Sequence, residues 1–235
     1  MADLAAEFPP GDRFDSVVVD EAQDFADEWW AAVFAALRDA ETGGLFVFAD
    51  EGQRVFARQG RPPLQLPPFP LARNLRNTKQ IANTFFSLAA SQMSAAGGDG
   101  PPVRFVPSST EEAVGVADDE ADRLLEEGWP SEHVALLTTG SRHPVQVERQ
   151  AEGPDAYWAS YWDTDDLFYG HVLGFKGLER SAVVLAVNGF RDEARAKEML
   201  YVGLSRARDL LVVCGDLELI RRVGGEGVVR RLVRP

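Results

Sequence analysis

The chain has one cysteine, three histidines and no long apolar run among its 235 residues. With Cys214 alone, no internal disulfide can form, which fits a reducing compartment. The longest apolar stretches are far shorter than the roughly 20 residues of a transmembrane helix. The N-terminus also lacks the basic and apolar regions of a secretory signal. We therefore expect a cytoplasmic protein without membrane contact, and the spacing of the histidines indicates no metal site.

Basic residues are too few to balance the acids. There are 24 Lys and Arg residues against 37 Asp and Glu residues, which gives a net charge of −13. Proteins that depend on contacts with phosphate backbones are usually basic, because counterion release supplies most of that affinity. The charge balance therefore argues against strong stand-alone binding to nucleic acid, although a basic groove can lie within an acidic surface.

A phosphate-binding loop of the form Gly-x-x-x-x-Gly-Lys-Ser/Thr is also missing from the sequence. Its usual companion is present, because the apolar run Val17–Val19 is followed by Asp20 and Glu21. The run predicts a buried strand, and open α/β sheets bind ligands at the carboxyl ends of their strands. One carboxylate can hold Mg²⁺, while the other can deprotonate a water that attacks a phosphoryl group. The alternative is a solvated turn in which Asp24 caps the next helix.

Predicted strands and helices alternate along the chain. The expected strands are 17–19, 45–49, 103–106, 134–138, 182–187 and 210–214, and the expected helices are 26–40, 77–93, 109–128, 193–208 and the segment after 216. This alternation predicts an α/β fold with a parallel sheet and helices on both faces, while 141–170 is expected to be irregular. The proline-rich segment 61–70 cannot form regular structure, so it predicts a linker between domains 1–60 and 71–235.

Other residues suit a nucleotide site. Gln53 follows the second predicted strand, where a neutral amide can sense a γ-phosphate; its alternative is a turn glutamine. Arg76 and Arg206 are candidate arginine fingers, since a guanidinium stabilises charge spread over phosphoryl oxygens; lone arginines are otherwise surface residues. Glu179, in a Lys-Gly-Leu-Glu string before a strand, can accept a hydrogen bond from a ribose hydroxyl.

Taken in order, these strings resemble the UvrD/Rep type of superfamily 1 DNA helicase. The resemblance covers 20–24 (motif II), 49–56 (motif III), 71–78 (motif IV), 175–179 (motif V) and 200–208 (motif VI). It implies the RecA-like P-loop NTPase fold, with part of the first domain and all of the second, and without the large inserted subdomain. The similarity is greatest to helicases that carry a nuclease-related domain.

The resemblance also implies residue roles. It assigns Mg²⁺ to Asp20, the catalytic base to Glu21, the γ-phosphate sensor to Gln53, the fingers to Arg76 and Arg206, nucleotide contacts to Lys176, Gly177, Glu179 and Tyr201, and DNA contacts to Phe56 and Arg58. Two positions depart from the family pattern. Arg58 stands where the family often has a tryptophan, and His171-Val172-Leu173 replaces the Thr-x-His of motif V.

We therefore expect the C-terminal portion of an ATP-dependent DNA helicase that moves on single-stranded DNA. ATP and Mg²⁺ are expected to bind only with a missing N-terminal half, so the chain alone should be inactive and bind DNA weakly or not at all. The alternative is a non-catalytic helicase-derived module that binds a protein partner, which the net acidity favours. The short first domain should leave a sheet edge open, to be covered by its second domain, the missing half or a second copy in a homodimer.

Overall fold

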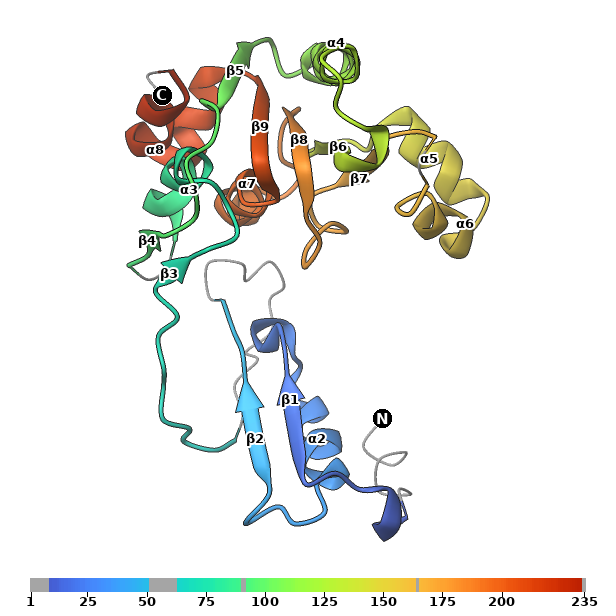
Figure 1. Ribbon diagram of the computed structural model, residues 1–235, viewed down its shortest axis with the longest axis vertical. Helices are drawn as coiled ribbons and strands as arrows, with labels where there is room; N and C mark the ends of the chain where they lie inside the picture. Colours follow the sequence, from blue (N-terminus) through green and yellow to red (C-terminus); the bar gives the residue numbers. More distant parts are fainter. Residues whose placement is uncertain (1–8, 51–62, 90–91, 164, 234–235) are drawn as a thin grey trace. The chain divides into compact units, whose positions relative to one another are not determined.

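A computed structural model describes residues 9–50, 63–89, 92–163 and 165–233 (Figure 1). The chain divides into two compact units, unit 1 (Met1–Pro70) and unit 2 (Leu71–Pro235). The division therefore falls at the end of the proline-rich segment 61–70.

Unit 1 is built on two parallel strands connected through a short helix. Its elements, with η for a 3₁₀ helix, are η1 (Pro10–Asp12), β1 (Ser16–Val19), η2 (Ala22–Asp24), η3 (Asp27–Trp29), α2 (Trp30–Ala36) and β2 (Gly44–Val47). The helix is shorter than the predicted 26–40. It ends early because the backbone on either side of Leu37 pairs with Phe14: the Phe14 amide donates to the Ala36 carbonyl, and the Arg38 amide donates to the Phe14 carbonyl.

The two faces of the unit 1 sheet differ in their surroundings. Val19 and Trp30 belong to the small core between the strands and α2. Successive side chains of a strand point to opposite faces. Val18, which is paired in register with Phe46, accordingly remains 64% exposed, and Phe46 remains 57% exposed. Strands that are apolar on both faces are typical of sheets covered by helices on both sides, so this face has the composition of a buried one.

Unit 2 is centred on a five-stranded parallel sheet in the order β5-β9-β8-β6-β7 (Figure 1). Its strands are β5 (Arg104–Pro107), β6 (Val134–Thr138), β7 (Phe168–His171), β8 (Arg180–Val187) and β9 (Ala207–Gly215), with a separate pair β3 (Arg73–Asn74) and β4 (Ser94–Ala95). Its helices are α3 (Lys79–Phe85), η5 (Phe86–Leu88), α4 (Ala113–Glu126), η6 (Ser131–His133), α5 (Pro144–Ala151), α6 (Pro154–Ala159), η7 (Glu193–Arg195), α7 (Ala196–Leu204) and α8 (Leu217–Val233).

Helices cover both faces of this sheet. On one face, Val184 and Ala186 of β8 belong to the same buried cluster as Ala121 of α4. On the other face, Leu185 lies against α7, where a Cβ on Gly203 would come within 2.8 Å of its Cδ1 atom. The predicted α/β class, a parallel sheet with helices on both faces, is confirmed by this arrangement.

The segment 141–170 was predicted to be irregular but contains α5, α6 and the edge strand β7. Each helix has its proline at the first position, Pro144 and Pro154, where the missing N–H costs no hydrogen bond. The aromatic residues form the local core, with the Tyr157 and Phe168 rings 5.4 Å apart. In this segment the prolines therefore mark the first residues of helices and do not indicate irregular structure.

Candidate functional site

The two adjacent carboxylates predicted as a metal and base pair lie directly after β1. Asp20 is exposed, and its Oδ1 accepts a hydrogen bond from the Glu21 amide at 2.9 Å. Glu21 has φ 52° and ψ 37°, and it is the one non-glycine residue with positive φ in the described part of the chain. A residue with a Cβ pays about 1 kcal/mol or more for this left-handed conformation. Such strain is concentrated at functional sites, which makes this turn a candidate.

Gln23 connects this turn to the end of the neighbouring strand. Its Nε2 donates to Glu21 Oε2 at 2.5 Å, and its Oε1 accepts from the Asp50 amide at 2.9 Å. The side chain is only 1% exposed. Gln23 therefore orients the Glu21 carboxylate and holds together the segments that follow β1 and β2. Sequence reasoning assigned it no role, although its position two residues after Glu21 was visible.

Three predicted site residues, Gln53, Phe56 and Arg58, lie outside the described residues, so their roles stay predictions.

In unit 2, three of the helicase-like motifs meet at the amino-terminal ends of β8 and β9. Arg76 Nε lies 2.8 Å from Glu179 Oε2, and both side chains are about half-exposed. Arg208 lies 3.7 Å from the other oxygen of Glu179 and donates to Ser181 Oγ at 2.6 Å. The structure thus brings Arg76, a candidate finger, into contact with Glu179, a candidate ribose contact. Half-exposed ion pairs stabilise a fold little, so the pair can separate at low cost.

Arg206, the second candidate finger, is 1% exposed. Its Nε donates to the Val202 carbonyl at 3.0 Å, and its Nη2 donates to Ser205 Oγ at 2.8 Å. Its Nη1 donates to the Leu178 carbonyl at 3.3 Å. In this conformation the guanidinium stabilises the backbone around motifs V and VI, and its role as a finger stays a prediction.

The remaining predicted nucleotide contacts lie close to this cluster in sequence. Gly177 is exposed with φ 81°, a left-handed value that favours glycine, and Lys176 beside it is half-buried. Tyr201 is 2% exposed and contacts Phe85 edge to face, with the ring centroids 5.4 Å apart. The contacts of these three residues with a nucleotide stay predictions.

Asn77 fixes the backbone that carries both candidate fingers. Its Nδ2 donates to the Ser205 carbonyl at 3.0 Å and to the Ala207 carbonyl at 2.6 Å, on either side of Arg206. Its Oδ1 accepts from Asn74 Nδ2 at 2.8 Å. The amide is 1% exposed. Asn77 is thus a positioning residue that sequence reasoning missed, and its place next to Arg76 was the available signal.

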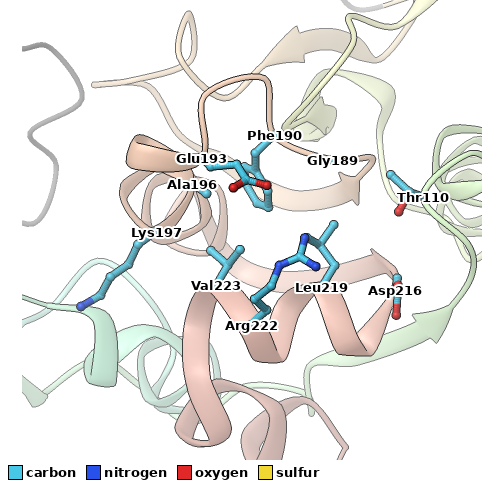
Figure 2. Close-up of a pocket in the computed structure, with 10 residues that line it drawn as sticks. All are labelled: Thr110, Gly189, Phe190, Glu193, Ala196, Lys197, Asp216, Leu219, Arg222 and Val223. Carbon is cyan, nitrogen blue, oxygen red and sulfur yellow. The ribbon is translucent and has the colours of Figure 1, made fainter.

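Described residues line two pockets at the carboxyl-terminal edge of the unit 2 sheet. The larger, about 520 Å³, lies beside β8, β9 and α8 (Figure 2). Figure 2 shows Arg222 directed into it and Lys197 at one side, with the acids Glu193 and Asp216 on its rim. Two cations and two carboxylates give no net charge, so this pocket indicates no class of ligand.

His171 lies at the second pocket, at the end of β7. Its Nδ1 accepts a hydrogen bond from the Leu173 amide at 3.2 Å. Burial lowers the pKa of His171, and the positive charges of Arg142 and Arg191 lower it further, while backbone contacts at Thr139 and Gly140 oppose these effects. We therefore assign a neutral imidazole at pH 7.

The depressed pKa predicts a loss of stability in mild acid. An unfolded histidine titrates near pH 6.5. Below that value the unfolded chain binds a proton that folded His171 resists, so the free energy of unfolding should fall as the pH drops through this range. The measurement is urea unfolding of the full chain at a series of pH values. His171→Asn should reduce this slope, and an unchanged slope in that variant would contradict the assignment.

Within the described ranges, no group of three or more His, Cys, Asp or Glu side chains is arranged to hold a metal ion. A single carboxylate can nevertheless serve Mg²⁺, which keeps several waters and takes one or two carboxylates. Exposed Asp20 fits that requirement. Among the helices in the described part of the chain, none has both the length and the apolar character to cross a bilayer.

No protein-family model matches the chain, and no curated protein sequence matches it. Among solved structures, one that is similar is the C-terminal domain of a possible DNA helicase from Lactobacillus plantarum WCFS1. The two chains are 16% identical, and the alignment covers 67% of this chain and 93% of the other, with a TM-score of 0.41. Similarity at this level carries no argument about function, and the α/β assignment rests on the five-stranded sheet itself.

Proposed function

We propose that the chain is the C-terminal portion of a cytoplasmic ATP-dependent DNA helicase of the UvrD/Rep type, which couples ATP hydrolysis to movement on single-stranded DNA. The observation that carries the proposal is the turn after β1. Glu21 adopts a costly left-handed conformation, and a buried amide, Gln23, holds its carboxylate in place. Gln23 also joins the segments after β1 and β2, but the strain at Glu21 is what an oriented general base would account for.

The residues after β1 have complementary tasks in this proposal. Asp20 would hold Mg²⁺ through its carboxylate, and the ion would neutralise charge on the β- and γ-phosphates. Glu21 accepts the proton of the water that attacks the γ-phosphate. Because Gln23 donates to Oε2, the plane of the Glu21 carboxylate is set before substrate arrives. Preorganisation of this kind lowers the barrier, since no reorientation is needed during reaction.

The cluster in unit 2, taken by itself, suits contacts with a nucleotide. Glu179 accepts a hydrogen bond from the ribose, and Arg76 turns from Glu179 to the phosphate oxygens. The 2.8 Å contact between them supplies a resting partner for each charge until the nucleotide arrives. Asn77 keeps Arg76 close to the segment of Arg206, so both guanidinium groups would respond to one ligand.

The phosphate loop must come from outside this sequence, because the sequence contains no such loop. We propose an N-terminal helicase half or a partner protein as its source. A docking surface is available in unit 1, where Val18 and Phe46 point away from α2 and are more than half exposed. In α/β proteins a layer of helices covers such a face.

A second candidate function is a non-catalytic module that binds a protein partner. The burial of Arg206 favours it, since a finger held among backbone carbonyls serves the fold. The left-handed Glu21 opposes it, because an interaction module has no need of a strained carboxylate.

The test is ATP hydrolysis by the full chain, alone and combined with the phosphate-loop half of a UvrD/Rep-type helicase, with and without single-stranded DNA. We expect no hydrolysis by the chain alone and DNA-stimulated hydrolysis by the combination. Hydrolysis by neither would support the non-catalytic module. Hydrolysis by the chain alone would contradict the need for an external loop.

A further inference from the structure

The surface of unit 2 at the end of α6 carries two exposed tryptophans. Trp162 is 79% exposed, more than any other large apolar side chain described in unit 2. Trp158, four residues earlier, is 40% exposed, and its ring stacks on Phe168 with an interplanar angle of 17°. Single exposed apolar residues need no explanation, whereas two indoles on one short segment do. The helicase-like motifs do not include this segment, so the proposed nucleotide site does not account for it.

Trp162 is fixed to the body of unit 2 by an aromatic cluster. Its ring lies edge to face on Tyr161, with the ring centroids 4.9 Å apart, and the Tyr161 ring lies 5.4 Å from Phe168. Tyr161 is buried, and its Oη donates to the Glu179 carbonyl at 2.9 Å. The Arg180 guanidinium lies over the Tyr161 ring, 3.7 Å from its centroid. Trp162 is therefore held on a rigid base, and such preorganisation reduces the entropy lost on binding.

Acidic residues flank Trp162 in the chain. Asp155 lies in the first turn of α6, Asp163 directly follows Trp162, and the Asp165 amide donates to Asp163 Oδ1 at 3.0 Å. All three carboxylates are exposed, and none of them forms an ion pair within the described residues. The segment 144–170 contains six acids and one arginine, and that arginine is already paired with an acid. The exposed indole therefore lies in a strongly negative part of the surface.

This combination selects a cationic partner. The face of a tryptophan ring attracts the side chains of arginine and lysine, and unpaired carboxylates attract the same side chains. A nucleic acid strand would bring phosphates against the carboxylates, which opposes stacking of a base on Trp162. A second copy of the chain in a symmetric dimer would bring the same carboxylates to the contact. A protein segment with positive side chains is therefore the occupant that the charges favour.

We propose that the surface formed by Trp162, Asp155, Asp163 and Asp165 docks a basic segment of a partner protein. An arginine of the partner covers the Trp162 ring, and neighbouring basic residues pair with the three carboxylates. Arginine suits this contact better than lysine, because its guanidinium is weakly hydrated and stacks on aromatic faces. The inference goes beyond the proposed function and does not depend on it, since the surface is present whether or not the chain takes part in hydrolysis.

The test is fluorescence anisotropy of the full chain with a labelled synthetic peptide of about 12 residues that contains arginine, leucine and alanine. It is done at about 50 mM salt, where charge pairs are screened little. Trp162→Ala should weaken binding about tenfold or more, as truncation of a central aromatic anchor does. Trp162→Phe should weaken it less, because a ring face remains. Asp155→Asn/Asp163→Asn should weaken binding about threefold to tenfold and reduce its salt dependence.

Two matched controls separate this surface from the general acidity of the chain. Phe69→Ala removes another ring, which is 85% exposed, and Asp119→Asn/Asp122→Asn removes two exposed charges of α4. Thermal unfolding checks that every variant is folded. Equal affinity of the Trp162→Ala and Phe69→Ala proteins would overturn the proposal. Equal weakening by the two aspartate pairs would also overturn it, because binding would then follow net charge alone.

The other occupants are tested with the same variant. A peptide with glutamate in place of arginine should not bind, and equal binding of the two peptides would contradict the selection by charge. Binding of a labelled deoxyoligonucleotide that Trp162→Ala weakens would assign the surface to nucleic acid. A dimer in sedimentation velocity that Trp162→Ala dissociates would assign it to a second copy. Either result would overturn the proposal, as would absence of binding of the arginine peptide. None of these results bears on hydrolysis, which the ATPase assay decides separately.

Discussion

Replacement of Glu21 by glutamine is expected to abolish nucleotide hydrolysis and to leave unit 1 folded. Glutamine has the same size and still accepts the hydrogen bond that Gln23 donates to Glu21 Oε2. It cannot take up the proton of an attacking water. Because a positioned general base contributes about 10²- to 10⁴-fold, we expect a loss of that size in kcat. The measurement is phosphate release by the chain combined with a phosphate-loop half.

The control for this change is Glu28→Gln, which alters an exposed acid of η3 in the same unit. Nucleotide binding should be unchanged in both variants, since the base acts on the water and not on the ground-state nucleotide. Retention of the full rate in the Glu21→Gln protein would remove Glu21 from the mechanism. A parallel loss of binding would instead indicate a damaged turn.

Glycine is a less informative substitute at this position. With φ at 52°, Glu21 lies where glycine has no steric cost, so Glu21→Gly would relieve the backbone while also removing the carboxylate. The change in the free energy of unfolding would combine the relief of backbone strain with the loss of the hydrogen bond from Gln23. Glutamine keeps the backbone strain and the hydrogen bond, and therefore isolates the proton transfer.

The central strands of unit 2 were predictable because they are continuous apolar runs. Residues 134–138, 182–187 and 210–214 lie within β6, β8 and β9, which occupy the middle of the sheet and are buried on both faces. The edge strand β7 was missed because Phe168–His171 mixes aromatic, glycine and histidine residues. An edge strand has a neighbouring strand on one side only, so its amino-acid composition can be more varied than that of a central strand.

In the candidate site, too, the residues in a local sequence string were predictable, whereas the contacts between distant segments were not. Asp20 and Glu21 could be found because a short string after an apolar run carries the signal. The contacts of Gln23 with Asp50, and of Asn77 with Ser205 and Ala207, join segments far apart in sequence, so no local pattern predicts them. The burial of Arg206 ran against expectation, since arginine is seldom fully buried unless paired.

Replacement of Asn77 by alanine is expected to be the most destabilising polar change described here in unit 2. The amide donates to two buried carbonyls, at 3.0 Å and 2.6 Å, and a buried group that loses its partner costs about 1–3 kcal/mol. We therefore expect a loss of about 2–4 kcal/mol in the free energy of unfolding, since the two costs act together. Asn77→Asp should be worse, because it places a carboxylate against the two carbonyls.

The measurement for Asn77 is urea unfolding, read by hydrogen exchange of β9 so that unit 2 is followed by itself. Asn83→Ala, on the exposed side of α3, makes the same change without a buried partner and should shift the midpoint little. Equal midpoints for the two variants would mean that the Ser205 and Ala207 carbonyls find other donors. In that case Asn77 would not position the fingers, because a backbone that is stable without the amide does not depend on it for its geometry.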